Sequence, residues 1–488
     1  MYSIAVHRLS TAFQWLPIHR TWRNLSVLSR RSRLRANAGP ANVSVIASHP
    51  TLMPLPTTAT APFCPSEVKG SIVIDARQSR WTKLKRFAGP GLLVAIGYMD
   101  PGNWATDIQA GSQFGYSLLW VVALSSLAAI FLQMLAARLG LVAGRDLAQA
   151  SYERYGRTGR LVQWITAEIS IIACDIAEVL GCALAFKLLL GVPISWGIVL
   201  TALDTMIVLG LQGKGFRQIE AIVFGLIGTM AFCFIAQVAM APPDWHAVAA
   251  GLVPGAPSHD RRDAIVLALG IVGATIMPHN LYLHSSVVQT RRVVGGKRGD
   301  VHDTLALVRI DTWGSLLIAM CVNAAILILA GSVFHASGQT NVTDIEQAYQ
   351  LITPIAGGAA AFMFGIALLA SGQSSTLTGT IAGQVIMDGF LHMKIPCYQR
   401  RLITRGLALV PALIGVLWLG DGAVGKLLVW SQVLLSLQLP FAMWPLIRSV
   451  SDPRVMKGNT IGRPTQIFAW CLFVVITGTN LLLIFGLS

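Results

Sequence analysis

Charged residues are scarce in this chain of 488 residues. Asp, Glu, Lys and Arg together make up 12% of it, whereas hydrophobic residues make up 54%. This balance excludes an ordinary soluble globular protein, in which about a quarter of the residues are charged. Apolar runs of about 20 residues, each long enough to cross a bilayer core, recur from residue 88 to the C-terminus. The sequence therefore predicts an all-α polytopic membrane protein.

Eleven such spans are predicted. They cover residues 88–110, 117–143, 161–190, 193–211, 219–241, 264–289, 304–335, 348–372, 401–419, 426–448 and 466–487.

Cysteine pairs are also missing. The seven cysteines are scattered, no CxxC occurs, and five of them lie inside predicted spans: Cys174, Cys182, Cys233, Cys321 and Cys471. This spacing indicates neither a disulfide framework nor a thiolate metal site. We expect buried apolar thiols.

Acidic residues are absent before Glu67, while arginine recurs and is densest in SRRSRLR at 29–35. This composition is typical of a transit peptide, but a misplaced start or a segment lying on an anionic membrane surface would also produce it. We interpret residues 1–80 as a basic, disordered cytoplasmic tail or a misannotated start, without a function. Residues 81–488 would then form the transmembrane domain.

The formal charge of +15 reflects how the chain is oriented in the membrane. Basic clusters precede the first span and then occupy every second loop, whereas the alternate loops are short or carry acids such as Asp344 and Glu346. This positive-inside pattern places the N-terminus in the cytoplasm and, with eleven spans, the C-terminus outside. It also argues against a nucleic-acid partner.

The first span contains a helix-breaking segment, GYMDPGNWATD at 97–107. Pro101 removes a backbone donor and Gly102 is a poor helix former, so the helix should unwind there. Unwound backbone within a membrane is tolerated only where it is buried in protein or lines a cavity. The break, with Asp100 beside it, should therefore lie inside the helix bundle.

The sixth span carries a matching segment, ATIMPHNLYLH at 274–284, in which Pro278 and Asn280 repeat the spacing of Pro101 and Asn103. Because the two spans run in opposite directions, the pattern predicts an inverted-repeat transporter with its site at the midplane. Two ordinary proline kinks are the alternative.

Side chains at the two breaks suit a divalent transition metal. Asp100 and Asn103 offer oxygen ligands, and the soft sulfur of Met277 favours Mn(II), Fe(II) and later metals over Mg²⁺ or Ca²⁺. Freed carbonyls, of which Gly97 and Ala274 are candidates, would complete the set. Otherwise Met277 simply fills a gap in the core.

A row of acids on the third span provides a candidate proton route. Glu168, Asp175 and Glu178 fall on one face of a helix, which must point away from lipid. With His279 and His284 on the sixth span, they could form a proton relay, because desolvated carboxylates can exchange protons near neutral pH. Alternatively, the acids form a structural network with Arg400 or Arg401, and His279 is a satisfied core histidine.

These segments resemble a known family. DPGNWATD (100–107), MPHNLYLHSS (277–286) and GQSSTLTGTIAGQ (372–384), together with AEISIIACDIAEVLG in the third span, look like the hallmark segments of the Nramp family. From about residue 86 onward the chain resembles in particular the bacterial proton-coupled manganese transporters.

The resemblance implies a LeuT-type fold of eleven transmembrane helices, with five-plus-five inverted repeats and broken helices 1 and 6. It implies Asp100, Asn103, Met277 and the Ala274 carbonyl as metal ligands, with Gln432 joining in an occluded state. Proton-route candidates are Asp100, Glu168, Asp175, Glu178, His279 and Arg401, and Arg291 on the sixth span is a candidate gate residue. The segment 372–384, which follows the eighth predicted span, would be a packing and gate element.

The implied function is import of Mn(II), and of Fe(II) or Cd(II), with protons into the cytoplasm by alternating access across a bacterial inner membrane. No cofactor, enzymatic activity or obligate protein partner is expected beyond metal ions, protons and the lipid bilayer. Alternatives are a magnesium transporter of the same family, which Met277 argues against, and a LeuT-type symporter for an organic substrate. A membrane enzyme is disfavoured because no nucleophile–base constellation occurs, and a receptor would need a larger soluble domain.

Overall fold

The computed structural model describes residues 69–210, 216–255, 260–294, 300–391, 397–420, 422 and 424–485. The chain divides into two units, Met1–Leu55 and Pro56–Ser488, and the whole of the first lies outside the described residues.

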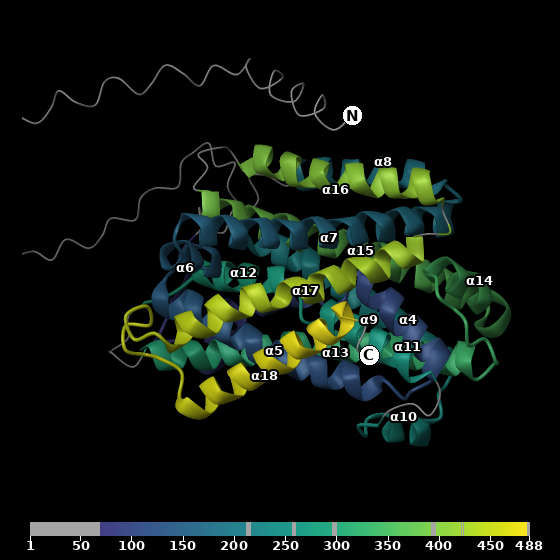
Figure 1. Cartoon of the computed structure of the whole chain (residues 1–488), viewed down its shortest axis with the longest axis horizontal. Coiled ribbons are helices and arrows are strands. Elements are labelled where there is room, and N and C mark those ends of the chain that lie inside the picture. The colour runs from purple at the N-terminus through teal and green to yellow at the C-terminus, as the bar shows by residue number, and fades with distance from the viewer. Residues whose placement is uncertain are drawn as a thin grey trace, which may run out of the picture. The chain divides into compact units, whose positions relative to one another are not determined.

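The described residues are almost entirely helical (Figure 1). The elements are β1 (Ile72–Asp75), α2 (Arg80–Phe87), α3 (Pro90–Gly97), α4 (Pro101–Phe114), α5 (Leu119–Ala143), α6 (Leu147–Arg154), α7 (Arg157–Leu190), α8 (Ile194–Gly210), α9 (Phe216–Met240), α10 (Trp245–Gly251), α11 (Arg261–Thr275), α12 (Pro278–Val287), η1 (Val288–Thr290), β2 (Arg291–Val294), α13 (Asp300–Ala330), η2 (Gly331–His335), α14 (Ile345–Ala356), α15 (Gly358–Leu391), α16 (Cys397–Leu419), α17 (Val424–Ser451) and α18 (Arg463–Ile484).

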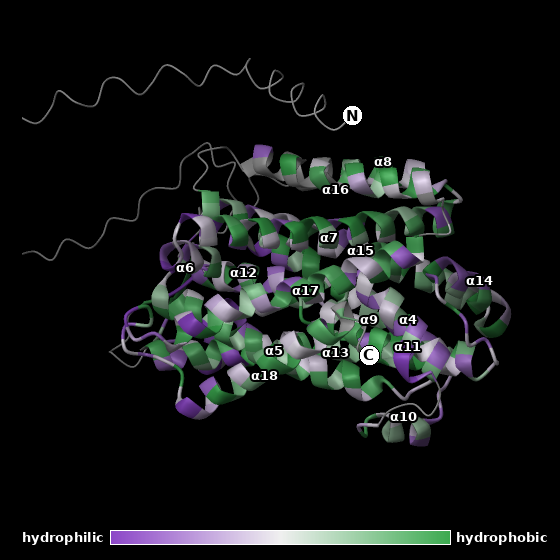
Figure 2. Ribbon diagram, viewed as in Figure 1, coloured by the Kyte–Doolittle hydropathy of each residue, from purple (hydrophilic) through white to green (hydrophobic). Residues whose placement is uncertain are grey.

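Within the described residues, eight helices are long and apolar enough to cross a membrane, and two shorter apolar stretches lie in α8 and α16. Figure 2 shows hydrophobic residues along these helices, with hydrophilic residues gathered at their ends. The prediction of an all-α polytopic membrane protein is therefore confirmed, while the count of eleven spans stays a prediction.

The two predicted helix breaks are present and lie next to each other. Residues 98–100 separate α3 from α4, and residues 276–277 separate α11 from α12. Helix α3 contacts α12, and α4 contacts α11. The first half of one broken helix thus packs on the second half of the other, so the two run antiparallel, as inverted repeats require.

The broken helices are surrounded by long ones. Helices α5, α7, α13, α15 and α17 all contact them, and the main hydrophobic core lies among these elements. On the other side of α7, α8 and α16 pack together against it (Figure 1). These helices consequently separate the two breaks from lipid.

The eighth predicted span is wrong in its bounds. The run 348–372 is divided at Gly357, whose φ of 91° ends α14, and α15 then continues to Leu391. The segment 372–384 therefore lies within α15 and does not follow a span. A left-handed backbone angle suits glycine, because it has no Cβ to clash.

The interpretation of residues 1–80 as a disordered tail is also wrong for its last part. Residues 72–75 form β1, which pairs in parallel with β2. Ile74 is fully buried in a small cluster with Phe87 and Val288. Burial of this side chain anchors the strand, so ordered structure begins before residue 80.

Candidate functional site at the two helix breaks

The first break exposes a carbonyl and fixes a carboxylate. Asp100 caps α4: its Oδ1 accepts hydrogen bonds from the backbone N–H of Asn103 at 2.9 Å and from Asn103 Nδ2 at 2.7 Å. Pro101 has no N–H, so the carbonyl of Gly97 lacks the donor that an unbroken helix would place four residues on. Both candidate ligands therefore result from the same proline.

The second break repeats this arrangement. Pro278 begins α12 and removes the donor that would otherwise serve the carbonyl of Ala274. That carbonyl instead accepts a hydrogen bond from Nδ2 of Asn103 at 3.1 Å. Asn280, the counterpart of Asn103, donates to the sulfur of Met277 at 3.7 Å. One amide side chain thus follows each proline, and the first one joins the two breaks.

The unwound backbone of the first break is held by side chains that the sequence analysis missed. Asn323 of α13 donates to the carbonyl of Tyr98 at 2.7 Å, and Ser371 of α15 donates to that of Met99 at 2.5 Å. Because buried carbonyls need donors, these contacts stabilise the break as a fixed feature of the fold.

The candidate ligands are all inaccessible to solvent. Asp100, Asn103, Ala274, Met277 and Gln432 are each at most 1% exposed. Two buried oxygens, Asp100 Oδ2 and Gln432 Oε1, have no hydrogen-bond partner. Buried acceptors without donors are costly, and a cation would satisfy them.

Gln432 of α17 reaches the first break. A Cβ added to Gly102 would lie 1.8 Å from Gln432 Nε2 and 3.0 Å from Asp100 Oδ2. The glycine thus leaves room for both side chains, and the structure brings together Gln432 and Asp100. In the described part of the chain no three His, Cys, Asp or Glu residues gather as a metal site. A metal would therefore depend on the amide, thioether and carbonyl groups around Asp100.

The amide of Asn103 faces the site with its nitrogen. Nδ2 contacts Asp100 Oδ1 and the Ala274 carbonyl, two oxygens that a cation would also bind. Coordination by Asn103 needs its oxygen instead, and the two ends exchange by rotation of the amide group. A metal would thus replace this nitrogen as the group shared by the two oxygens.

The acidic row on α7 is buried as its spacing predicts. Glu168 is 8% exposed, Asp175 is 1% exposed and Glu178 is fully buried. Gly379 of α15 packs directly against the row: an added Cβ would lie 2.8 Å from Glu178 Oε1 and 2.9 Å from Asp175 Oδ1. The segment 372–384 therefore permits close approach of α15 to these acids.

Cys174 connects this row with the second break. Its Sγ lies 3.5 Å from Nε2 of His279 and donates to Glu178 Oε1 at 3.5 Å. The sequence analysis took Cys174 for an apolar thiol, although its position one helical turn before Glu178 could have indicated the contact. A hydrogen-bonded chain consequently runs from His279 to Glu178.

The other two candidates for proton transfer have different outcomes. His284 Nδ1 lies 3.0 Å from Gln133 Oε1, and Gln133 Nε2 donates to the hydroxyl of Tyr98 at 2.8 Å. His284 therefore joins the first break through α5 and, within the described structure, makes no hydrogen bond to the acidic row. Arg401 and its neighbour Arg400 are outside the residues whose side chains are described.

Arg291 forms a buried ion pair beside the start of α3. Its Nη2 lies 2.5 Å from Glu220 Oε1 and donates to the carbonyl of Ala88 at 2.9 Å. Asp311 of α13 accepts hydrogen bonds from the N–H groups of Gly89, at 3.1 Å, and Gly91, at 2.7 Å. These contacts hold β2, α9, α13 and the start of α3 together at one end of the bundle.

Two details of this cluster differ from the sequence analysis. Arg291 begins β2 and does not lie on the sixth span, because α12 ends at Val287. Glu220 and Asp311 were missed as its surroundings, although ionisable residues within apolar spans are a functional signal.

Comparison with known families gives a match over most of the chain. Residues 91–486 match the family described as Nramp, natural resistance-associated macrophage protein-like. Among curated relatives, a divalent metal cation transporter MntH of Ralstonia nicotianae is 60% identical over 88% of this chain and 97% of its own length. The divalent metal cation transporter MntH 1 of Pseudomonas aeruginosa is also 60% identical, over 88% of this chain and 98% of its own.

Solved structures agree with this match. A manganese transporter of Eremococcus coleocola superposes with a TM-score of 0.80 at 38% identity, covering 86% of this chain and 90% of its own. The transporters Mhp1 and MhsT share only the fold, with TM-scores of 0.54 and 0.55 at 16% and 14% identity, over 81% of this chain and 90% and 97% of theirs. The LeuT-like fold is thereby confirmed.

Proposed function

The chain belongs to the Nramp family, and on this premise we propose that it imports divalent transition-metal ions, Mn(II) foremost, together with protons. Fe(II) and Cd(II) are further candidate substrates. The observation that carries the proposal is the meeting of the two breaks: Asn103 joins Asp100 to the Ala274 carbonyl, and unpaired buried oxygens of Asp100 and Gln432 lie beside them. Relatives described as divalent metal cation transporters and the solved structure of a manganese transporter support the proposal.

The proposed metal site consists of Asp100 and Asn103 from the first break and Met277 from the second. The carbonyls of Ala274 and Gly97 add oxygen, and Gln432 joins when the site is closed from both sides. The sulfur provides selectivity, because a thioether adds little to the binding of Mg²⁺ or Ca²⁺ but favours softer metals. This ligand set disfavours the magnesium-transporting branch of the family.

Protons would leave the metal site through His279. Cys174 lies within 3.5 Å of both His279 Nε2 and Glu178 Oε1, which makes it the connecting group. From Glu178 the buried row continues through Asp175 to Glu168 along α7. Arg401 stays a further candidate for this route, as the resemblance implies.

Transport would proceed by alternating access around the breaks. The ion pair of Arg291 and Glu220 closes one end of the bundle, and it must separate when that end opens. The chain is a multi-pass membrane protein, and we place it in a bacterial inner membrane with the N-terminus in the cytoplasm and the C-terminus outside.

Uptake of Mn(II) into proteoliposomes with an inward proton gradient tests the proposal. Asp100→Asn should abolish uptake, and Met277→Ala should retain part of it but allow Ca²⁺ to compete. Met443→Ala is the matched control, since Met443 is also fully buried but lies in the core of α17. Absence of Mn(II) uptake by the unchanged protein, or mutants that behave like Met443→Ala, would refute the metal-symport proposal.

A further inference from the structure

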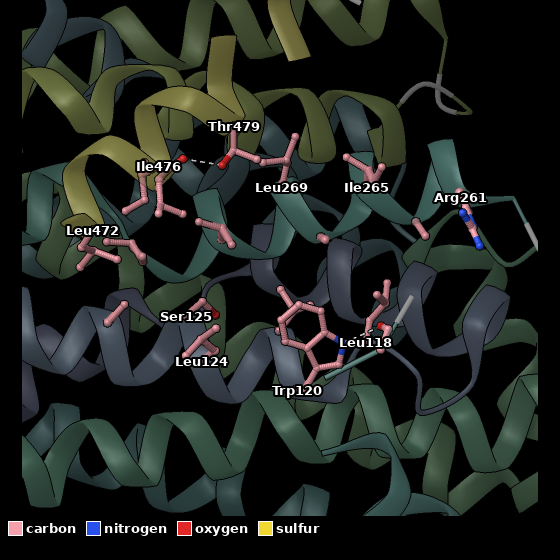
Figure 3. Close-up of a pocket in the computed structure, with 18 residues that line it drawn as sticks. Leu118, Trp120, Leu124, Ser125, Arg261, Ile265, Leu269, Leu472, Ile476 and Thr479 are labelled. Atoms are coloured by element: carbon pink, nitrogen blue, oxygen red, sulfur yellow. Dashed lines mark hydrogen bonds between the residues drawn. The ribbon is translucent and has the colours of Figure 1, made fainter. Parts of the chain in front are cut away.

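A groove opens between three membrane helices, α5, α11 and α18, apart from the proposed metal site. Its volume is about 570 Å³, a size typical of sites for small molecules. Figure 3 shows that Arg261 lies at one end and Leu472 at the other, with apolar side chains between them. The groove is therefore an elongated apolar slot with a cation at one end.

The lining follows one stripe of each helix. On α11 it runs from Arg261 through Ala268 to Val272, with Ile276 directly after the helix, and on α18 it runs from Leu472 to Thr479, at helical spacing. The small side chain of Ala268 makes room between the helices. Helices α5 and α18 and the segment Arg261–Thr290, which begins with α11, are each long and apolar enough to span the membrane. Exposed apolar side chains such as Leu124 and Val475 line the groove, so it faces hydrocarbon.

Polar groups along the slot are already paired, with one exception. Ser125 Oγ donates to the carbonyl of Val122, Thr479 Oγ1 to that of Val475, and Trp120 Nε1 to that of Gly255. Arg261 makes no hydrogen bond or ion pair with other described residues. The neighbouring Asp260 and Asp263 do not line the groove, so its mouth presents a positive charge.

The slot is long enough to span one leaflet. From Arg261 to Thr275, α11 rises about 21 Å, and half of a bilayer core is about 15 Å thick. A chain that enters beside Arg261 would thus reach the middle of the membrane. Ile276 directly precedes Met277, so the inner end of the groove adjoins the second break.

We propose that this groove binds one acyl chain of an anionic phospholipid, whose phosphate pairs with Arg261. The apolar stripes exclude a polar ligand, and the unpaired guanidinium selects a negatively charged headgroup. A bound chain would support α11 against α5 and α18. Its effect on transport rests on the proposed function, whereas its binding does not.

Native mass spectrometry of the delipidated full-length protein, titrated with phosphatidylglycerol or phosphatidylcholine, tests the binding. The unchanged protein should retain one phosphatidylglycerol in preference to phosphatidylcholine. Ala268→Trp fills the groove and should lower that occupancy about tenfold, which corresponds to about 1.4 kcal/mol. Arg261→Gln should remove the preference between the two lipids and keep binding of the chain.

Matched controls are available on the same helices. Arg262 and Val474 are exposed and do not line the groove, so Arg262→Gln and Val474→Trp should bind lipid like the unchanged protein. Equal occupancy in Ala268→Trp, or binding of annular lipid only, would overturn the proposal. Mn(II) uptake is measured separately. If the unchanged protein and all variants fail to take up Mn(II) while lipid binding is intact, the proposed function is refuted and the lipid proposal stands.

Discussion

Asn103 of α4 donates a hydrogen bond to the carbonyl of Ala274 in α11 at 3.1 Å, although the two residues are 171 positions apart. A proline makes each group available for this bond. Pro101 starts the helix that carries Asn103, and Pro278 removes the helical N–H donor from the carbonyl of Ala274. This contact links the two inverted repeats at their breaks. A cation at this place would bind both halves of the fold at once.

Gly181 of α7 is expected to be indispensable for the position of the first break. A Cβ there would lie 2.1 Å from Cγ of Pro101, a rigid ring that cannot move aside. Gly181→Ala should destabilise the protein by about 1–3 kcal/mol and strongly reduce Mn(II) uptake. Gly225→Ala on α9 is the control, because nothing lies within 4 Å of its added Cβ. If both variants melt and transport alike, close packing at the break is unimportant.

The ion pair at Arg291 should contribute more than the neighbouring one. Arg291 and Arg217 both contact Glu220, but the Arg291 side chain is 0% exposed and that of Arg217 is 42% exposed. Arg291→Gln leaves a buried carboxylate with one weaker partner, which costs about 3–5 kcal/mol, whereas Arg217→Gln should cost at most about 1 kcal/mol. Thermal unfolding in detergent compares them, and equal shifts in Tm would contradict the difference in burial.

The two helix breaks and the common face of the acidic row could be predicted from the sequence, because the effect of proline and the helical periodicity act within one segment. Partners from distant segments were missed: Asn323 and Ser371 at the first break, and Glu220 and Asp311 near Arg291. Their positions depend on how the helices pack, which a single sequence does not reveal. Glycines that allow close packing, such as Gly379, look like any other small residue until their neighbours are known.

Cys174 is expected to link His279 with the acidic row through its thiol. Cys174→Ala removes the hydrogen-bonding group and should lower proton-driven uptake several-fold, while Mn(II) binding persists. Cys174→Ser restores a donor of similar size and should recover most of the rate. Cys233→Ala, at another buried cysteine, controls for cavity formation. Mn(II) uptake and Mn(II) binding are measured on the same preparations. Normal uptake by Cys174→Ala would exclude a role of the thiol in proton transfer.

Asp146, which caps α6 outside the membrane spans, should make stability depend on pH. Burial raises the pKa of its carboxyl from 3.8 to about 6, although the Gln149 N–H lowers it. Because the folded pKa exceeds the unfolded one, this residue stabilises the protein below pH 4 and the contribution is lost as pH rises through 6, by up to about 3 kcal/mol. Asp146→Asn retains a good helix cap, and its Tm should depend less on pH between about pH 4 and 6 than that of the unchanged protein. An unchanged pH profile would mean that the carboxyl titrates normally.

The pairing of β1 with β2 should keep one end of the bundle closed. Parallel strands tie residues just before α2 and α3 to the segment that begins at Arg291, and Ala76 N–H donates to the carbonyl of Val294. Ile74 is fully buried under the sheet, whereas Val73 beside it is 44% exposed. Ile74→Ala should therefore cost about 2–5 kcal/mol locally, and Val73→Ala almost nothing.

Hydrogen exchange of the β1 and β2 amides distinguishes these two variants. Ile74→Ala should expose the amides to exchange at least tenfold faster, because local opening of the strands no longer breaks a packed contact. The same variant should shift the transporter toward the conformation in which the ion pair of Arg291 and Glu220 is separated, detectable as labelling of a cysteine introduced at Ser315, which is 8% exposed and lies one helical turn after Asp311 in α13. If the amides exchange faster but the labelling is unchanged, the strands open independently of this end of the bundle, and β1 is an anchor without influence on access.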